Sequence, residues 1–223
     1  MSRMFSLIND GSSSAQVTSN EMDVQFVTTA LSADMLETNY PLGLFPMANP
    51  GREPITWHRP RRRAVIPLEA FHVSRSLART LRQGRFRVSF DEAFDAVMRA
   101  CADRPDRDGT WIDDRILASY GELHHRGKAH SVEIWSADGK LAGGVYGVQL
   151  GGAFFAESKF HTVRDMSKVA LAHLVFRLRE RGFALLEVQY VTSHLEQFGA
   201  IEIPNRLYEK QLAAALALDC RFV

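Results

Sequence analysis

The alternation of apolar and polar residues is clearest in the C-terminal half of the chain. In residues 129–135, apolar Val132 and Ile134 alternate with polar neighbours, a spacing that predicts a half-buried strand. Residues 138–139, Asp-Gly, then favour a tight turn, and residues 141–150 have the composition of the returning strand. The pattern therefore predicts a β-hairpin.

A third strand, a helix and a further strand follow in the pattern. Residues 153–160 predict the third strand, which we expect to be interrupted at polar Glu157. An amphipathic helix begins near Ser167 and ends at Gly182, a typical C-terminal cap. The apolar run 183–191 then predicts a buried central strand. This succession is typical of an α+β fold.

Two polar residues interrupt that last apolar run. Glu187 and Gln189 are two positions apart, so on a strand they share one face. Burying a carboxylate or an amide without a partner costs on the order of a few kcal/mol. The two side chains therefore either satisfy one another or bind a polar ligand, unless they lie at a solvated edge of the sheet.

The N-terminal half gives shorter signals. A helix is expected from Ser32, its N-cap, to Pro41, and residues 41–60 are so rich in Gly, Pro and aromatics that we expect packing rather than regular structure to fix them. The other predicted elements are a strand at 64–68, a helix between Ser74 and Gly84, a strand and a helix within 86–104, a helix at 112–125, a short helical segment at 193–199, a strand at 200–204 and a final helix at 205–218.

Length and composition indicate a globular protein. The 223 residues, 46% of them hydrophobic, suffice for one large domain or two smaller ones, and the polar residues 1–22 predict a mobile tail. No apolar run long enough to span a membrane and no signal peptide is visible. Cys101 and Cys220 lie far apart, which favours a reducing cytoplasm over a disulfide framework.

Positive charge is concentrated in one segment. Residues 59–87 hold nine arginines and a single acid, Glu69. Arg75, Arg79 and Arg82 follow one another at spacings of four and three, which puts them on one face of the predicted helix. The planar guanidinium group of arginine can donate two hydrogen bonds to one phosphate, so this helix face indicates a contact with nucleic acid. The alternative is a face that is only solvated.

Motifs of several enzyme classes are missing from the sequence. There is no Walker loop, GxGxxG, GxSxG, HExxH or CxxC pattern, and the eight histidines are scattered. The sequence therefore predicts no metal and no cofactor. What remains is an enzyme that works by positioning its substrates, or a binding module.

Several segments together resemble the leucyl/phenylalanyl-tRNA–protein transferase family. The segments YPLGLFPMA, FHVSRSLARTLR, GKAHSVEIW, LAGGVYGV, FFAESKF and EVQYVTSHLEQFGA match the family's motifs in order. The resemblance covers roughly residues 30–215. It implies a small N-terminal domain at 23–63 and, at 64–223, a domain similar to acyl-CoA N-acyltransferases (GNAT-like), with a mixed, mainly antiparallel sheet flanked by helices.

The resemblance also implies a reaction. Family members move leucine or phenylalanine from aminoacyl-tRNA to the N-terminal Arg or Lys of an acceptor protein, which marks that protein for degradation. The partners implied are thus a leucyl- or phenylalanyl-tRNA and an acceptor protein, with no membrane. We expect a cytoplasmic monomer that needs no cofactor.

Site residues carry over by their place in the motifs. Gln189 matches the family's catalytic glutamine, and Glu187 stands where the family has Asp, as a proton acceptor. Glu157 matches the glutamate of the GESMF motif, which orients the aminoacyl-adenosine end of the tRNA. Trp111 and Met47 occupy the positions that flank the terminal adenine.

The resemblance further implies an apolar pocket for the aminoacyl side chain. Lys159 and Ala156 depart from the motif, where the family has Met and Gly; we expect the Lys159 ammonium to turn to solvent. The predicted pocket wall consists of Val145, Phe154, Leu174, Leu178 and Leu186. The predicted phosphate contacts are Arg62, Arg63, Arg75, Arg79 and Arg82.

Two alternatives stay open at this stage. One is an acyl-CoA-dependent N-acyltransferase, although the chain lacks the glycine-rich pyrophosphate loop of those enzymes. The other is a tRNA-binding protein that has lost catalysis, which the changes at Ala156, Lys159 and Glu187 motivate.

Overall fold

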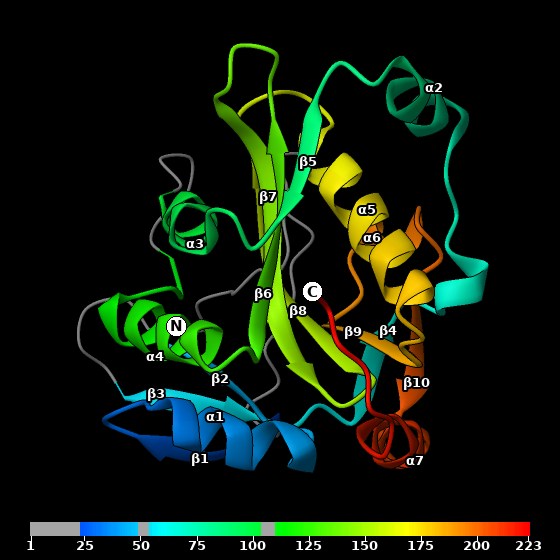
Figure 1. Ribbon diagram of the computed structural model, residues 1–223. Coiled ribbons are helices and arrows are strands. Elements are labelled where there is room, and N and C mark those ends of the chain that lie inside the picture. Colours follow the sequence, from blue (N-terminus) through cyan, green and yellow to red (C-terminus); the bar gives the residue numbers. More distant parts are fainter. Residues whose placement is uncertain (1–22, 49–53, 104–109) are drawn as a thin grey trace.

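The fold consists of two β-sheets and the helices packed on them. The computed structural model describes residues 23–48, 54–103 and 110–223. The predicted mobile tail at 1–22 lies outside the described residues. In Figure 1 the larger sheet stands upright in the centre, and the smaller sheet lies across its lower end.

The smaller sheet is formed by the N-terminal part of the chain. It has three antiparallel strands in the order β1-β3-β2: β1 (Val24–Thr28), β2 (Phe45–Met47) and β3 (Ile55–His58). Helix α1 (Ala33–Asn39) lies beside it, and the Ser32 Oγ accepts the Met35 N–H at 3.2 Å, as an N-cap does. The expectation of no regular structure within 41–60 is wrong, because β2 and β3 pair there.

The larger sheet is mixed and mainly antiparallel. Its order is β10-β4-β9-β8-β7-β6-β5, and β8 and β9 pair in parallel. The predicted boundary between residues 63 and 64 falls inside its second strand. The strands are β4 (Arg62–Val65), β5 (Arg87–Phe90), β6 (Ala129–Trp135), β7 (Leu141–Leu150), β8 (Ala153–His161), β9 (Leu185–Gln189) and β10 (Ile201–Pro204).

Helices cover both faces of this sheet. A Cβ built on Gly143 would meet Met166 of α5, whereas one built on the next residue, Gly144, would meet Val97 of α3. Neighbouring strand residues point to opposite faces, so α5 and α3 lie on opposite sides of β7, as Figure 1 shows. The helices of the larger part are α2 (Arg75–Gln83), α3 (Phe94–Ala102), α4 (Asp114–His125), α5 (Met166–Glu180), α6 (Ser193–Glu196) and α7 (Asn205–Leu216), with a 3₁₀ turn at η3 (Leu68–Ala70).

Coverage on both faces corrects the prediction for β6. Ser131 and Glu133, expected to face water, are 1% and 0% exposed. The Glu133 carboxylate instead accepts hydrogen bonds from the hydroxyls of Ser131 and Ser89. Alternation of polar residues predicted the strand correctly but not its burial, because the polar side chains satisfy one another inside.

Glu157 does not interrupt β8 but forms a β-bulge in it. Tyr146 of β7 pairs with Ser158 and Gly147 pairs with Ala156, so Glu157 is the extra residue between two paired positions. The bulge shifts the alternation of side chains beyond it. Glu157 and the residue two positions later therefore point to opposite faces of the sheet, contrary to a strict period of two.

The strand opposite the bulge depends on a glycine. A Cβ built on Gly147 would lie 2.3 Å from the Phe155 carbonyl oxygen and 2.5 Å from the Phe154 ring. We expect Gly147→Ala to lower the free energy of unfolding by about 3 kcal/mol, since backbone must move to admit the methyl group.

The matched control is Gly121→Ala in helix α4, where the new Cβ would meet only Asp95 Oδ1 at 3.9 Å. Alanine favours a helix over glycine, so this change should be neutral or stabilising by up to about 1 kcal/mol. Urea denaturation compares both with the unchanged protein. Equal midpoints for the two variants would contradict the close packing at Gly147.

Candidate active site

Three polar side chains predicted from the sequence meet in the interior. Glu157, Glu187 and Gln189 are 0%, 0% and 1% exposed. The alternative that Glu187 and Gln189 lie at a solvated edge is therefore wrong. Buried carboxylates need partners, and the partners found here explain most of the site's geometry.

Gln189 ends strand β9 in an unusual backbone conformation. Its φ of 64° lies in the left-handed region, which costs a non-glycine residue about 1 kcal/mol. Its backbone N–H donates to Glu187 Oε1 at 3.0 Å, and its side-chain Nε2 donates to Glu157 Oε2 at 2.9 Å. The two carboxylates thus hold the backbone and the amide of Gln189 separately.

Glu187 forms a buried ion pair with Arg63. The Arg63 Nη2 lies 2.7 Å from Glu187 Oε1, and Arg63 is 1% exposed. The guanidinium also donates to the Gly43 carbonyl and lies over the rings of Phe45 and Tyr208, at 5.1 and 4.3 Å from their centroids. Burial raises the pKa of the Glu187 carboxyl, while the charge of Arg63 opposes that rise.

This pair corrects the prediction for Arg63. A fully buried guanidinium paired with Glu187 is not a surface contact for a tRNA phosphate. Arg63 instead joins the two sheets, because it reaches from β4 to the Gly43 carbonyl and to Phe45 of β2.

Glu157 is held by two tyrosines that the sequence reasoning missed. Tyr40 donates to Glu157 Oε1, and the hydroxyls of Tyr40 and Tyr120 lie 2.6 Å apart. Burial raises the pKa of Glu157 to about 8, although the hydrogen bonds from Tyr40 and Gln189 favour the charged form. The sequence contains no pattern that marks these two tyrosines, although a buried tyrosine hydroxyl needs a partner.

Two buried oxygens of the site have no hydrogen-bond partner within the described residues. They are Gln189 Oε1 and the hydroxyl of Tyr146, which stands at the β7 side of the Glu157 bulge. Buried polar atoms are nearly always paired, so the Gln189 oxygen is a candidate contact for a polar ligand.

The predicted pocket wall forms part of one apolar cluster. Its five residues are at most 2% exposed and pack together on the α5 side of the sheet; they are Val145, Phe154, Leu174, Leu178 and Leu186. The structure thus brings them together, and their contact with an aminoacyl side chain stays a prediction.

Lys159 does not turn to solvent, and that prediction is wrong. It pairs with Val145 across the β7–β8 ladder, is 0% exposed, and its Nζ lies 3.1 Å from His194 Nδ1. The bulge at Glu157 directs Lys159 toward the α5 side, where α6 supplies the histidine partner.

The residues predicted to flank the adenine are nearly buried. Trp111 and Met47 are 8% and 4% exposed and belong to the same apolar cluster as Tyr40 and Tyr120. Their cluster therefore adjoins the hydroxyls that hold Glu157. A role in adenine binding stays a prediction.

The remaining predicted phosphate contacts are at the surface. Arg75, Arg79 and Arg82 are exposed on α2, which lies at the upper right of Figure 1, far from the small sheet. Arg62 is 56% exposed and pairs with Glu202 at 3.0 Å. A phosphate at Arg62 would have to replace that pair.

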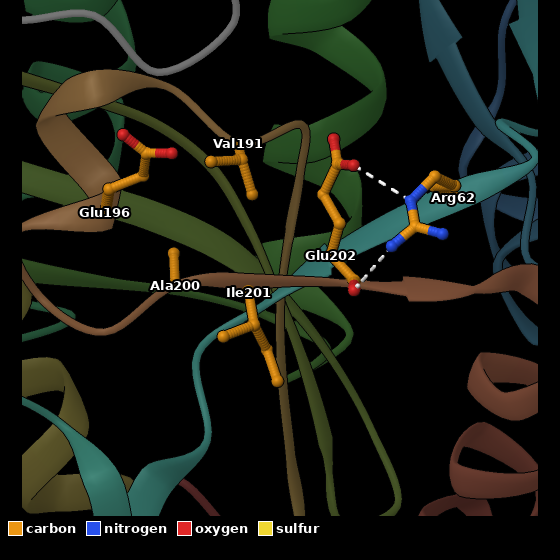
Figure 2. Close-up of a pocket in the computed structure, with 6 residues that line it drawn as sticks. All are labelled: Arg62, Val191, Glu196, Ala200, Ile201 and Glu202. Carbon is orange, nitrogen blue, oxygen red and sulfur yellow. Dashed lines mark hydrogen bonds and ion pairs between the residues drawn. The ribbon is translucent and has the colours of Figure 1, made fainter.

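Figure 2 shows a surface recess, one of whose lining residues follows Gln189 closely in the sequence. Val191, two residues after Gln189, lines it together with Glu196 and Glu202. Arg62 donates to both the side chain and the backbone carbonyl of Glu202, so one of the two acids is already paired.

Within 23–48, 54–103 and 110–223, no three His, Cys, Asp or Glu side chains are grouped to hold a metal ion. No helix of these segments has the length and apolar character needed to cross a membrane.

The buried ion pair generates the first prediction for the site. Arg63→Met leaves Glu187 buried without its cation and should lower the free energy of unfolding by about 3–5 kcal/mol. Replacing both residues by Met should recover most of this loss. The control is the adjacent, exposed Arg62→Met, which should cost less than about 1 kcal/mol. Equal losses for Arg62 and Arg63 in urea denaturation would contradict the pairing.

The raised pKa of Glu157 generates a second prediction for the site, on the pH dependence of stability. Between the ordinary pKa of 4.5 and about 8, the folded protein keeps a proton on Glu157 that the unfolded chain has lost. This contribution to stability is complete below pH 4.5 and is lost as the pH rises to about 8, at roughly 1 kcal/mol per pH unit.

Glu157→Gln cannot ionise, so its advantage in unfolding free energy over the unchanged protein should grow from about pH 5 to about pH 8. Urea denaturation at intervals of pH measures the difference. A difference that does not change with pH would show that Glu157 titrates normally in the fold.

Comparison with known proteins places these features in a family. The model of the family described as leucyl/phenylalanyl-tRNA protein transferase matches residues 65–213. The chain is 52% identical over 188 residues to a leucyl/phenylalanyl-tRNA–protein transferase from Ruegeria pomeroyi, covering 84% of this chain and 88% of that protein. The protein of the same name from Paramagnetospirillum magneticum is 53% identical over 192 residues, covering 84% and 90%.

Similarity to solved structures is weaker. The structure of L-PGS from Bacillus licheniformis gives a TM-score of 0.43 at 9% identity, covering 84% of this chain and 63% of that one. A TM-score so low carries no fold assignment. The sequence matches, in contrast, extend over most of both chains, and this protein belongs to the leucyl/phenylalanyl-tRNA protein transferase family.

Proposed function

We propose that the protein transfers leucine or phenylalanine from aminoacyl-tRNA to the N-terminal Arg or Lys of an acceptor protein in the cytoplasm. Family membership supports the reaction class. The observation that carries the proposal is the Gln189 amide, which is buried, fixed at its nitrogen end and unpaired at its oxygen. An N–H donor of a substrate amine is the complement of that oxygen.

The reaction requires no covalent intermediate between substrate and protein. The acceptor nitrogen attacks the ester carbonyl carbon, a C–N bond forms, the bond to the ribose oxygen breaks, and one amine proton ends on the released ribose hydroxyl. Since the ester is already activated, holding the amine in line can supply roughly 7–11 kcal/mol of the barrier reduction. In this proposal Gln189 Oε1 accepts an N–H of the attacking amine.

The aminoacyl side chain is proposed to contact the apolar cluster under α5, which lies on the other face of the sheet from the Glu157 carboxylate. Val145, Phe154 and Leu186 present only hydrocarbon, which suits leucine or phenylalanine. The mixed sheet and its parallel β8–β9 pair support a GNAT-like assignment for the larger part. Trp111 and Met47 are proposed to contact the terminal adenine, and the exposed arginines of α2 the phosphates.

Transfer of radiolabelled leucine from leucyl-tRNA to an Arg-starting protein tests the proposed function. Incorporation that needs no acetyl-CoA would support it and would exclude both the acyl-CoA-dependent enzyme and a pure binding module. Binding of tRNA without incorporation would contradict it.

Gln189→Ala should lower kcat at least about 100-fold, since the amide acts at the reacting atoms. The Kd for tRNA should change less than about twofold, because the side chain is buried away from the arginine surface. Gln197→Ala, an exposed residue just after α6, is the matched control and should keep full activity. Parallel losses of binding and turnover in Gln189→Ala would contradict the assigned role.

Replacing Arg75, Arg79 and Arg82 by Gln should weaken tRNA binding and flatten its salt dependence. The slope of log K against log salt concentration should become shallower by roughly 0.7–0.9 for each phosphate that is no longer bound. The control removes the same charge elsewhere, at the exposed Arg206, Lys210 and Arg221. An identical slope in both triple variants would show that the α2 face does not bind the tRNA backbone.

A further inference from the structure

We propose that Glu157 is the carboxylate that positions Gln189 for the transfer reaction, and that it does so only in its ionised form. Glu187, the residue expected to accept the proton, serves instead to hold the backbone. This inference rests on the proposed function, because it assigns a role within the same site.

The two carboxylates contact different parts of Gln189. Glu187 accepts the backbone N–H of Gln189 at 3.0 Å, and its remaining partners are Arg63 at 2.7 Å and Tyr208 at 3.5 Å. None of these contacts reaches the Gln189 amide. The charge of Arg63, at contact distance, opposes the rise in the pKa of Glu187 that burial causes.

Glu157 is the group that faces the Gln189 amide. Its Oε2 accepts from Gln189 Nε2 at 2.9 Å, while Tyr40 donates to its other oxygen. An ionised carboxylate only accepts hydrogen bonds, so it requires the amide nitrogen on its side and directs the amide oxygen away. The unpaired Gln189 Oε1 is the result of that orientation.

Protonation of Glu157 would reverse which end of the Gln189 amide faces the carboxyl group. A proton on Oε2 turns that oxygen into a donor, which pairs with an amide oxygen rather than an amide nitrogen. The Gln189 amide then gains by rotating, and its nitrogen would meet the acceptor amine. Gln189 Oε1 therefore faces the acceptor amine only when Glu157 is ionised.

The bulge gives Glu157 the freedom to take this position. As the extra residue of β8 it lies between two paired positions, which lets its side chain reach both Tyr40 and Gln189. A strand without the bulge would shift every later side chain to the other face.

Few other groups near Glu157 change charge in the relevant range. Burial raises the pKa of each surrounding tyrosine, so these stay neutral, and the arginine stays protonated. Glu187, whose pKa is also raised, is the other titrating group. The neighbours are Tyr40 from η2 (Tyr40–Leu42), Tyr120 from α4, Tyr146 from β7, Tyr208 from α7, Arg63 from β4 and Glu187 from β9.

The test is the pH dependence of kcat/KM for leucine transfer to an Arg-starting protein. The acceptor α-amine, with a pKa of roughly 7.7–8.0, must lose one proton, and in our proposal Glu157 must lose another. Below about pH 7 the logarithm of kcat/KM should therefore rise with a slope near two for the unchanged protein. Each rate is corrected for spontaneous hydrolysis of the ester.

Three variants separate the two carboxylates. Glu157→Gln keeps an amide oxygen for Gln189 Nε2 but cannot ionise, so its slope should fall to about one. Glu187→Gln should keep a slope near two. Glu157→Met, which cannot hold the amide, should lower kcat about 100-fold while the Kd for tRNA changes less than about twofold.

Tyr40→Phe gives an independent check that does not remove the carboxylate. Loss of the Tyr40 hydroxyl takes away a hydrogen bond that favours the charged form of Glu157. The pH at which the slope decreases should therefore shift upward.

The outcomes are distinct. A slope of two that persists in Glu157→Gln, or that is lost in Glu187→Gln instead, overturns the role of Glu157 while transfer itself is retained. Absence of leucine transfer by the unchanged protein overturns the proposed function, and the inference with it.

Discussion

The ion pair between Arg63 and Glu187 is the interaction on which the rest of the site depends. Arg63 lies on β4, yet its guanidinium reaches the Gly43 carbonyl and the Phe45 ring, so one buried charge joins the small sheet to the larger one. Its partner Glu187 accepts the backbone N–H of Gln189 and thereby compensates a left-handed conformation that a glutamine would otherwise avoid. A buried pair contributes little net stability, but its specificity fixes where the end of β9 lies.

The fixed end of β9 explains how the site suits aminoacyl transfer, because this reaction depends on the orientation of polar groups. Polar groups that are oriented before the substrate arrives need no reorganisation during the reaction. Gln189 is oriented at both its backbone and its amide, while Glu157 is kept buried with a pKa near that of an N-terminal amine. The same burial is a cost to stability above neutral pH, which is typical of functional groups retained in an interior.

Much of the fold followed from local signals in the sequence. Helix α2 begins after Ser74 and ends before Gly84 as predicted, and α5 ends near Gly182, because caps depend on neighbouring residues only. Sequence motifs also led to Glu157, Glu187 and Gln189, which the structure brings into contact. The errors concern tertiary structure: no period reveals the bulge that redirects Lys159, and a run of arginines does not show that Arg63 alone is buried. Tyr40 and Tyr120 were missed because the Tyr40 hydroxyl reaches Glu157 from the other part of the fold and Tyr120 joins it through Tyr40, contacts that no local pattern shows.

The central claim is that the unpaired Gln189 oxygen receives the attacking amine while Glu157 holds the amide nitrogen. A crystal structure with a non-hydrolysable aminoacyl-adenosine analogue and an Arg-starting peptide, at a pH above about 8, tests it most directly. We predict that the peptide's amino nitrogen lies within hydrogen-bond distance of Gln189 Oε1, with Glu157 still accepting from Gln189 Nε2. An amino nitrogen bound instead at Glu187, or one held only at the Glu196 and Glu202 recess away from Gln189, would contradict it.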